Sequence, residues 1–454
     1  MRFSKYLLTL LFVTGSILAN AQNTDTLLTL QKCLDIAVKN NLQVKQSVTN
    51  AELDRITLRQ QKENLLPSIS ASAGRTFFQG RGISPVTNSY VNQSSTADSY
   101  SLSGNMTLFN GFALINAVKS ASLAYQAGKM DFQAAKDAVT VNIITAYLLI
   151  LDAREQLNAS KSQLAVQKET VDRLTILEKQ GANKAASDLS DALGQYASNQ
   201  VQIVNAQNAL DAAKLGIYQL MNVTYQPNAS FEGLNAEELS GNYGSSPDQI
   251  YETALQQLAQ VKAATLRRQS AEKSVSSARG QLLPTLSVGA GLGTAYSNTA
   301  QKPVAGDTTG ATQSVPYSEQ FKNNYNSQVG LTLSVPLFLN GTRRNALAQA
   351  KVNLLSTRDI EENTKIVLKQ NIEQAYYNMM AAYRKYQSLQ DQVKAFSESF
   401  RIYKLRFDAG VLTSVEYITA KNNMDSANLN LIAARYDYFI DSKILDYYQG
   451  KLSF

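Results

Sequence analysis

Residues 368–407 read LKQNIEQAYYNMMAAYRKYQSLQDQVKAFSESFRIYKLRF. Apolar side chains in this stretch recur every seven residues in two rows, and the second row is displaced from the first by four residues. This is the spacing of the a and d positions of a coiled coil, so the stretch predicts a long helix that packs against other helices. The first row is Leu368, Ala375, Ala382, Leu389, Phe396 and Tyr403, and the second is Ile372, Met379, Tyr386, Val393, Phe400 and Phe407.

The same helix occurs a second time in the first half of the chain, where Val139 takes the place of Leu368. Residues 28–65 are also repeated, at residues 248–282, where Leu282-Leu283-Pro284 matches Leu65-Leu66-Pro67. Recurrence of several segments in the same order indicates an internal duplication. The earlier rows are Val139, Ala146, Ala153, Ser160, Gln167 and Leu174, and Ile143, Ile150, Leu157, Leu164, Val171 and Glu178.

After each of these prolines the apolar period changes from about 3.6 residues to two, which predicts β-strands. Each strand has one apolar face and one face of small polar residues, the pattern of a membrane-spanning strand. A strand of a soluble sandwich fits any single one of them equally well. The polar segments 79–98 and 297–326 between the strands are predicted to be exposed hairpin loops.

The helical pattern resumes after Asn110-Gly111 and Asn340-Gly341 and runs to Gly181 and Gly410. The rise of an α-helix gives each of these stretches a length of about 100 Å. A shorter helix follows each long one, so two short helices can flank the halves of each long helix. We predict a first repeat at 22–221 (a helix, a β-hairpin at 66–109, and helices at 111–180 and 185–221), a connector at 222–247, and a second repeat at 248–454 (a helix, a β-hairpin at 284–338, and helices at 342–409 and 413–448).

The N-terminus has the pattern of a secretory signal. Arg2 and Lys5 precede the apolar run from Leu7 to Leu18, and small residues end at Ala21, so we predict a signal peptide at 1–21. Beyond it, no stretch is expected to be a transmembrane helix. Removal of the signal takes away two positive charges and lowers the formal net charge from +7 to +5, too diffuse a charge to indicate nucleic-acid binding.

The composition excludes several chemistries. Cys33 is the only cysteine and there is no histidine, so the chain cannot form an intrachain disulfide and lacks the usual ligands of metal sites and the usual catalytic base. Cys33 is expected to be a small core residue on a helix. We expect no cofactor and no enzymatic activity, because a hydrolase here would need carboxylates alone and no clustered carboxylate motif exists.

Backbone groups in lipid need hydrogen-bond partners, so a membrane sheet must close, and small closed barrels have about eight strands. One chain supplies four strands. Three chains would form a twelve-stranded barrel that stays open. The predicted fold is an α+β membrane protein, with coiled-coil helices that form an α-barrel and four β-strands per chain in a shared, trimeric transmembrane β-barrel.

The order of elements, twice over, resembles that of the TolC-type outer membrane factors across essentially the whole chain after the signal. Residues 335–338 (Val-Pro-Leu-Phe), Asn340-Gly341 and Arg343-Arg344 are similar to the family's strand-to-helix junction, with Leu339 inserted and Thr342 in place of a second glycine. Residues 410–420, after the long helix, resemble the family's periplasmic tip.

The resemblance implies a homotrimeric exit duct in the outer membrane that extends into the periplasm. It implies as partners outer membrane lipid, a periplasmic adaptor (membrane fusion) protein and an inner-membrane transporter of the RND, ABC or MFS class, in an efflux pump or a type I secretion system. The alternative is a structural or adhesive coiled-coil trimer anchored in the outer membrane. The sequence does not identify the cargo.

The resemblance also implies roles at the two turns that follow the long helices. Acidic side chains at the tip would form the pore gate, for which Glu416 and Asp188 are the candidates, with Thr419 where the family has a second acid. An acidic residue near a helix start is also favoured by the helix dipole alone, which is the alternative for both. The turns that would dock the adaptor contain Gly181, Ala182, Gly410, Val411, Leu412 and Thr413.

Overall fold

The computed structural model describes residues 27–83, 89–180, 185–233 and 243–451. The predicted signal peptide, residues 1–21, therefore lies outside the described residues. The chain divides into two compact units. The first unit contains residues 1–50, 129–262 and 362–454, and the second contains residues 51–128 and 263–361.

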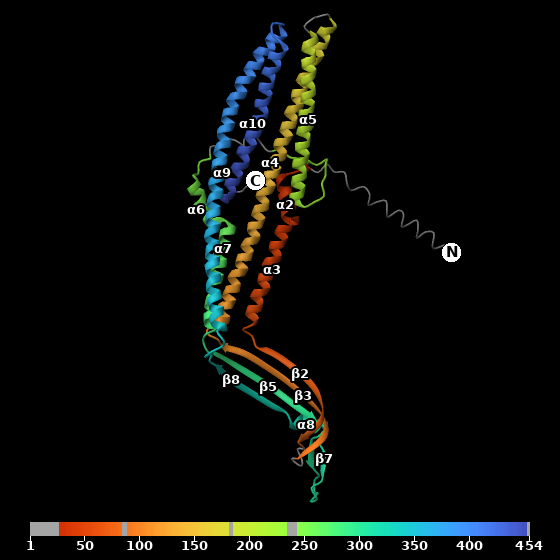
Figure 1. The fold of residues 1–454 in the computed structure, drawn as a ribbon, viewed down its shortest axis with the longest axis vertical. Coiled ribbons are helices and arrows are strands. Elements are labelled where there is room, and N and C mark those ends of the chain that lie inside the picture. Colours follow the sequence, from red (N-terminus) through yellow and green to blue (C-terminus); the bar gives the residue numbers. More distant parts are fainter. Residues whose placement is uncertain (1–26, 84–88, 181–184, 234–242, 452–454) are drawn as a thin grey trace, which may run out of the picture. The chain divides into compact units, whose positions relative to one another are not determined.

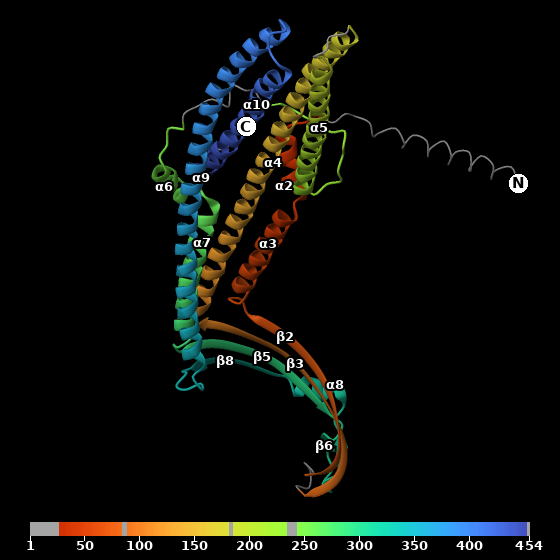
Figure 2. The ribbon, with the colours of Figure 1, turned by 45° about the horizontal axis from the view of Figure 1, so that its top comes forward.

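Helices α4 (Ala113–Lys179) and α9 (Thr342–Asp408) have 67 residues each and contribute residues to both units. Within the first unit, α5 (Ala185–Met221) runs alongside α4, and α10 (Ser414–Tyr448) runs alongside α9 (Figures 1 and 2). These four helices stand where the sequence predicts helices. The apolar seam of each long helix can therefore pack against the shorter helix beside it.

The sequence predicts one helix over residues 28–65, but the structure has two, α2 (Leu30–Asn40) and α3 (Leu42–Glu63). Asn41 interrupts the helix with an extended backbone (ψ 128°). Its backbone N–H still donates to the Ala37 carbonyl, while its side-chain oxygen accepts from the backbone of Gln43 at 2.9 Å. Asn41 thus ends one helix and caps the next, and an asparagine side chain can do this because it replaces backbone hydrogen bonds.

The second repeat has the same interruption at Leu258, between α6 (Pro247–Gln257) and α7 (Ala259–Gly280). The start of α6 is fixed by a capping box in which Ser246 and Gln249 each hydrogen-bond to the other's backbone. The single helix predicted at 248–282 is therefore also two helices. Periodicity alone missed both breaks because the apolar spacing continues across them.

The core of the first unit is built on the predicted seams. All twelve residues of the two rows in α9 are buried or half-buried, and Leu368, Ile372 and Met379 are almost fully buried. The seam of α4 is buried at most positions, although Glu178 at its end is exposed. Cys33 has no exposed surface, which confirms that it is a core residue.

Helix α4 is, among the described helices, the one that is long and apolar enough over 18 residues to cross a membrane. The sequence did not predict a membrane-spanning helix here. Its apolar residues have another explanation, because one face of α4 supplies the largest share of a core cluster shared with α2 and α5. The α4 members of that cluster include Val139, Ile143, Tyr147, Ile150 and Leu157.

A two-stranded parallel sheet ties the connector to this core. Strands β1 (Leu27–Leu28) and β4 (Ser230–Phe231) pair in register. The hydroxyl of buried Tyr147 donates to the carbonyl oxygens of Leu28 at 3.1 Å and Glu232 at 2.8 Å. One tyrosine therefore anchors both segments to α4.

The second unit contains an antiparallel sheet with the strand order β2-β3-β5-β8. The strands are β2 (Ser68–Ile83), β3 (Tyr90–Phe109), β5 (Thr285–Ser297) and β8 (Asn326–Ser334). Figures 1 and 2 show these strands as one curved layer. The sheet is open, so β2 and β8 are edge strands in the part of the chain that the structure describes.

Both loop predictions were wrong in part. The segment 79–98 belongs largely to β2 and β3, which pair from Ser68 with Asn105 to Ile83 with Tyr90, because a backbone ladder does not require apolar side chains. The segment 297–326 contains β6 (Gln301–Pro303), β7 (Thr312–Ser314) and the short helix α8 (Tyr317–Asn323).

The two faces of the sheet differ in chemistry, as the period of two predicts. On the polar face, serine hydroxyls of β2 and β3 hydrogen-bond across the strands, Ser70 with Ser103 at 2.9 Å and Ser72 with Ser101 at 2.8 Å. Such pairs between facing side chains stabilise a sheet. The other face, which we call the apolar face, carries a row on β5 and a row on β8. These rows are Leu286, Val288, Ala290 and Leu292, and Val329, Leu331 and Leu333.

In the second unit, Gly111 (φ 64°) lies against Gly280 so closely that a Cβ on either would come within 2.4 Å of the other's carbonyl oxygen. We expect Gly111→Ala to cost roughly 1–3 kcal/mol through the left-handed backbone alone, and more through the overlap. The measurement is the thermal unfolding midpoint of the purified protein.

The matched control is Gly194→Ala in α5, where an added Cβ meets no atom within 4 Å. This change should leave the midpoint unchanged or raise it slightly, since alanine is the better helix former. Equal midpoints for the two variants would contradict the packing role of Gly111.

Candidate functional site

The two turns that follow the long helices lie in the first unit. They connect α4 to α5 and α9 to α10, and Figure 1 shows the ends of all four helices toward the same end of that unit. We call the last two turns of α4 and α9, residues 409–413 and the first two turns of α5 and α10 the turn region. It contains the described residues of the predicted gate and docking site.

One apolar cluster joins the four helices in and next to the turn region. Leu174 of α4, Ala192 of α5, Phe407 of α9 and Tyr417 of α10 are its buried members. The rings of Phe407 and Tyr417 stack with centroids 4.5 Å apart, and the Tyr417 hydroxyl lies 3.4 Å from that of Thr170. The cluster fixes the start of α10 against the ends of both long helices.

A second link joins α4 to α9 at the rim of this cluster. The Arg173 guanidinium forms an ion pair with the carboxylate of Asp408 and also donates to the Asp408 carbonyl at 3.0 Å. The same guanidinium lies over the ring of Phe407, 5.9 Å from its centroid. On the other pair of helices, the hydroxyl of Ser414 donates to the carboxylate of Asp191 at 3.3 Å.

Next to the apolar cluster, α10 and α4 each bury a polar side chain. Lys421 is almost fully buried and pairs with Asp425 at 2.5 Å. Burial raises the pKa of Asp425, while its pairing with Lys421 opposes that shift. The buried seam residue Gln167 donates to the Ala192 carbonyl at 3.0 Å, and its side-chain oxygen accepts no hydrogen bond within the described residues.

Gly410, two residues after the end of α9, has a left-handed backbone with φ 72°. The Val411 N–H donates to the Arg406 carbonyl at 3.1 Å. The left-handed residue thus lets the chain close the end of the helix. Val411 is exposed and Leu412 packs against the apolar cluster. Gly181 and Ala182 lie outside the described residues.

Glu416 is held in a capping box at the start of α10. Its carboxylate accepts from the hydroxyl of Thr413 at 2.7 Å and from the Thr413 backbone N–H at 3.2 Å. These hydrogen bonds hold the pKa of Glu416 below its usual range. The side chain is exposed in the single chain, so the carboxylate caps the helix and also meets solvent.

The other two candidates for the gate are in different settings. The Thr419 hydroxyl donates to the Val415 carbonyl at 2.8 Å, a bond within the helix. Asp188 lies half-exposed in the first turn of α5, where the helix dipole favours an acid. Within one chain, the structure describes no contact that joins Asp188 to Glu416.

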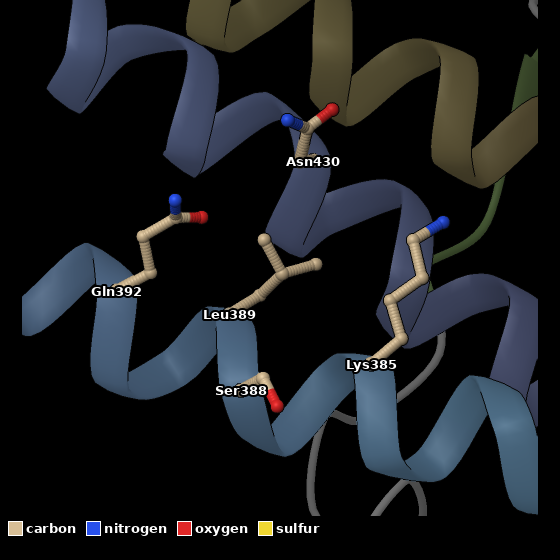
Figure 3. Close-up of a pocket in the computed structure, with 5 residues that line it drawn as sticks. All are labelled: Lys385, Ser388, Leu389, Gln392 and Asn430. Carbon is tan, nitrogen blue, oxygen red and sulfur yellow. The ribbon is translucent and has the colours of Figure 1, made fainter.

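A polar groove lies between α9 and α10, away from the turn region. It encloses about 440 Å³ and is lined by Lys385, Ser388, Leu389, Gln392 and Asn430. Figure 3 shows Lys385, Leu389 and Gln392 rising from α9 toward α10, which carries Asn430. The groove holds one charged group and no nucleophile with a base beside it. Elsewhere in the described residues, no three His, Cys, Asp or Glu side chains gather as metal ligands would.

Sequence reasoning missed the link between Arg173 and Asp408 and the buried pair of Lys421 and Asp425. The seven-residue pattern did identify Phe407 as a seam residue. It could not identify Arg173 and Tyr417, which contact the ring of Phe407, because they belong to other helices. Thr413 and Glu416 carried a usable signal, since threonine followed three residues later by glutamate is the sequence of a capping box.

A family model described as "Outer membrane efflux protein" matches residues 33–223 and 250–450. The outer membrane protein TolC of Escherichia coli is 22% identical over 407 residues, which cover 88% of this chain and 78% of that protein. The alkaline protease secretion protein AprF of Pseudomonas aeruginosa is 23% identical over 430 residues, which cover 92% and 83%.

Solved structures show the same fold. The Campylobacter jejuni CmeC outer membrane channel matches with a TM-score of 0.77 at 20% identity, and the match covers 93% of this chain and 86% of that one. The outer membrane protein VceC of Vibrio cholerae matches with a TM-score of 0.77 at 16% identity, over 93% and 96% of the two chains.

The apolar cluster yields a prediction about local stability. Tyr417→Ala removes the stacked ring that α10 contributes, and aromatic-to-alanine changes in a core cost about 3–5 kcal/mol. Hydrogen exchange of peptides from residues 400–430 should speed up strongly, while exchange in the sheet should stay unchanged. The matched control is Val415→Ala, two residues away and exposed. If both variants exchange alike, the ring of Tyr417 does not hold the turn region together.

Proposed function

The chain belongs to the outer membrane efflux protein family, and from this we propose that it is the exit duct through which an export system empties across the outer membrane. The family places the protein in the outer membrane as an efflux or secretion channel, which confirms the resemblance and the location predicted from the sequence. The family is one of channels and not of enzymes. The observation that carries the proposal is that the duplicated chain pairs long coiled-coil helices with a sheet that has one apolar face.

We propose that three chains complete the β-barrel. Strands β2 and β8 offer unpaired backbone groups at the two edges of the sheet, and such groups cannot be left unpaired in lipid. Three four-stranded sheets joined edge to edge would form twelve strands with the apolar face outward and the serine face around an aqueous lumen.

The helices support the same assembly. In one chain the seam of α9 is well buried only at its start and at Phe407, and the stretch between them is half-buried. A coiled-coil seam that is half-buried in the monomer is completed by a neighbouring helix in an α-barrel. The half-buried members are Tyr386, Leu389, Val393, Phe396, Phe400 and Tyr403.

We propose that the turn region is the periplasmic tip and that it meets a periplasmic adaptor, with an inner-membrane transporter of the RND, ABC or MFS class behind it. Relatives named for efflux and for protease secretion support a channel of this kind. The docking turns would include Gly410, whose left-handed backbone sets the exposed position of Val411. Their other members would be Gly181, Ala182, Leu412 and Thr413.

The gate is proposed at the start of α10. Three copies of Glu416 around a narrow axis would favour cations and disfavour anions. Thr419 adds no second charge, and Asp188 would add one only if α5 also faces the axis. The capping contact with Thr413 is compatible with this role, because it keeps the carboxylate ionised at neutral pH.

The alternative, an adhesive or structural trimer with a membrane anchor, needs only one pass of strands followed by a stalk. This chain enters the sheet twice and returns each time to a long helix. A duplicated re-entry builds a wall around a lumen, so we favour the channel.

The assembly prediction is that the protein, purified in detergent, has three times the mass of one chain. Native mass spectrometry measures this directly. A stable monomer that keeps its β-structure would contradict the shared barrel, since four strands with open edges should not persist alone in a micelle.

The function prediction uses planar bilayers. The purified protein should conduct, and Glu416→Gln should lower cation selectivity and weaken block by divalent cations severalfold, with no change in assembly. The capping hydrogen bonds lower the pKa of Glu416 within one chain, and repulsion among three copies on a narrow axis acts against this shift. Block of the unaltered channel should therefore disappear as pH falls through the pKa of the assembled ring.

The matched control is Glu398→Gln, an exposed carboxylate on α9 that pairs with Arg401. It should leave selectivity unchanged. Absence of any conductance would exclude the duct, whereas conductance with unchanged block in Glu416→Gln would leave Glu416 as a helix cap alone.

A further inference from the structure

The short helix α8 lies across the apolar face of the sheet and leaves a pocket beneath it. The pocket encloses about 540 Å³. This volume is within the range of about 300–1,000 Å³ of small-ligand sites. Its floor is formed by β2, β3 and β5, and its roof by Phe321 and by Tyr325, which follows α8. The side chains of the floor on this face include Ala71, Ala73, Tyr100, Leu102, Leu292 and Thr294.

Specific contacts hold α8 in this position. The Thr294 hydroxyl donates to the Phe321 carbonyl at 2.8 Å, and the hydroxyl of Tyr317 donates to that of Tyr100 at 2.9 Å. The Tyr317 ring lies 4.7 Å from that of Tyr296. At its start, α8 is also tied to the loop by the ion pair of Glu319 with Lys302 at 2.5 Å. Helix α8 is therefore held against the sheet by specific side-chain contacts.

The depth of the pocket follows from the strand count. Leu292 lies seven residues beyond Thr285, the end of β5 that follows α7. With Thr285 taken as the periplasmic edge of an apolar band about 25 Å tall, a rise of about 3.3 Å per residue and a tilt of about 45° put Leu292 roughly 16 Å above that edge. Tyr296, further along β5, would then reach roughly 26 Å, the level of an outer aromatic girdle. This placement would put the pocket in the outer half of the membrane, just below the girdle.

The chemistry of the pocket fits a hydrocarbon chain. Its lining consists of aliphatic and aromatic side chains and a few hydroxyl groups. The hydroxyl groups of Thr294 and Tyr100 are already hydrogen-bonded to α8. It opens on the face that, in the proposed barrel, meets lipid. Its roof residues Phe321 and Tyr325 are about half exposed, so a chain could enter from the bilayer.

We propose that this pocket binds an acyl chain of the glycolipid of the outer leaflet, lipid A, and so fixes a lipid molecule against each chain. The proposal rests on the proposed function, because it takes the apolar face to be the lipid face. The leaflet decides the source: at this depth the chains that reach the pocket belong to outer-leaflet lipid.

The test uses the full-length protein purified from outer membranes, delipidated in detergent, and titrated with purified lipid A during native mass spectrometry. We expect the unaltered protein to retain up to one lipid A per chain. Ala71→Phe, which fills the floor of the pocket, should lower occupancy at least severalfold. The matched control is Ala290→Phe, on the same face of the sheet but outside the lining, and it should retain the lipid.

A second variant guards against misfolding. Phe321→Ala opens the roof without adding bulk and should speed the loss of lipid A during delipidation. Conductance and oligomeric mass, measured on the same samples, separate the two proposals, since both should survive the loss of the lipid site.

Equal retention by the unaltered protein, Ala71→Phe and Phe321→Ala would overturn the site. So would a protein that, as purified from outer membranes and before delipidation, carries phosphatidylethanolamine and no lipid A, which would remove the outer-leaflet source. A protein that binds no lipid in any form would also overturn it.

Discussion

Everything in this chain depends on the two unpaired edges of a four-stranded sheet. A strand that spans hydrocarbon must pair every N–H and C=O group, and here the outer sides of β2 and β8 have no partner within the described part of the chain. In the proposed barrel, neighbouring chains would supply these partners. The same neighbours would complete the half-buried seams of the long helices, while the apolar face would meet lipid and the serine face the lumen.

The sequence predicted the helices of this fold better than its strands. A seven-residue period survives polar substitutions, so the seam was readable even where Ser160 and Gln167 occupy it, and both proved to be buried. The strands follow a period of two that fails wherever both faces are polar. Residues 93–96 (Gln-Ser-Ser-Thr) were therefore taken as loop, although their backbones continue the ladder. The breaks at Asn41 and Leu258 were missed because they change the backbone without changing the apolar spacing.

The candidate site was predictable in its parts but not in its connections. Gly410, Thr413 and Glu416 are local in sequence, and the structure gives each a local role in ending α9 or starting α10. Tyr417 carries a contact with Phe407 that depends on how two helices cross, and Arg173 reaches Asp408 from 235 residues away. Periodicity in the sequence cannot identify contacts between residues so far apart in the chain. The sequence therefore indicated which side chains are apolar or charged, but not which residues they contact.

The close contact of Gly111 with Gly280 separates two junctions that the duplication would have made alike. Gly341 is the counterpart of Gly111, yet a Cβ there would meet only the side-chain nitrogen of Asn345 at 3.6 Å. The counterpart of Gly280 in the first repeat is Glu63. One junction is thus locked backbone to backbone, and the other repeat has a glutamate in place of one of the two glycines that make this contact possible. In a ring of three such chains two kinds of junction would alternate, so the ring would have threefold symmetry and not the sixfold symmetry of two identical repeats.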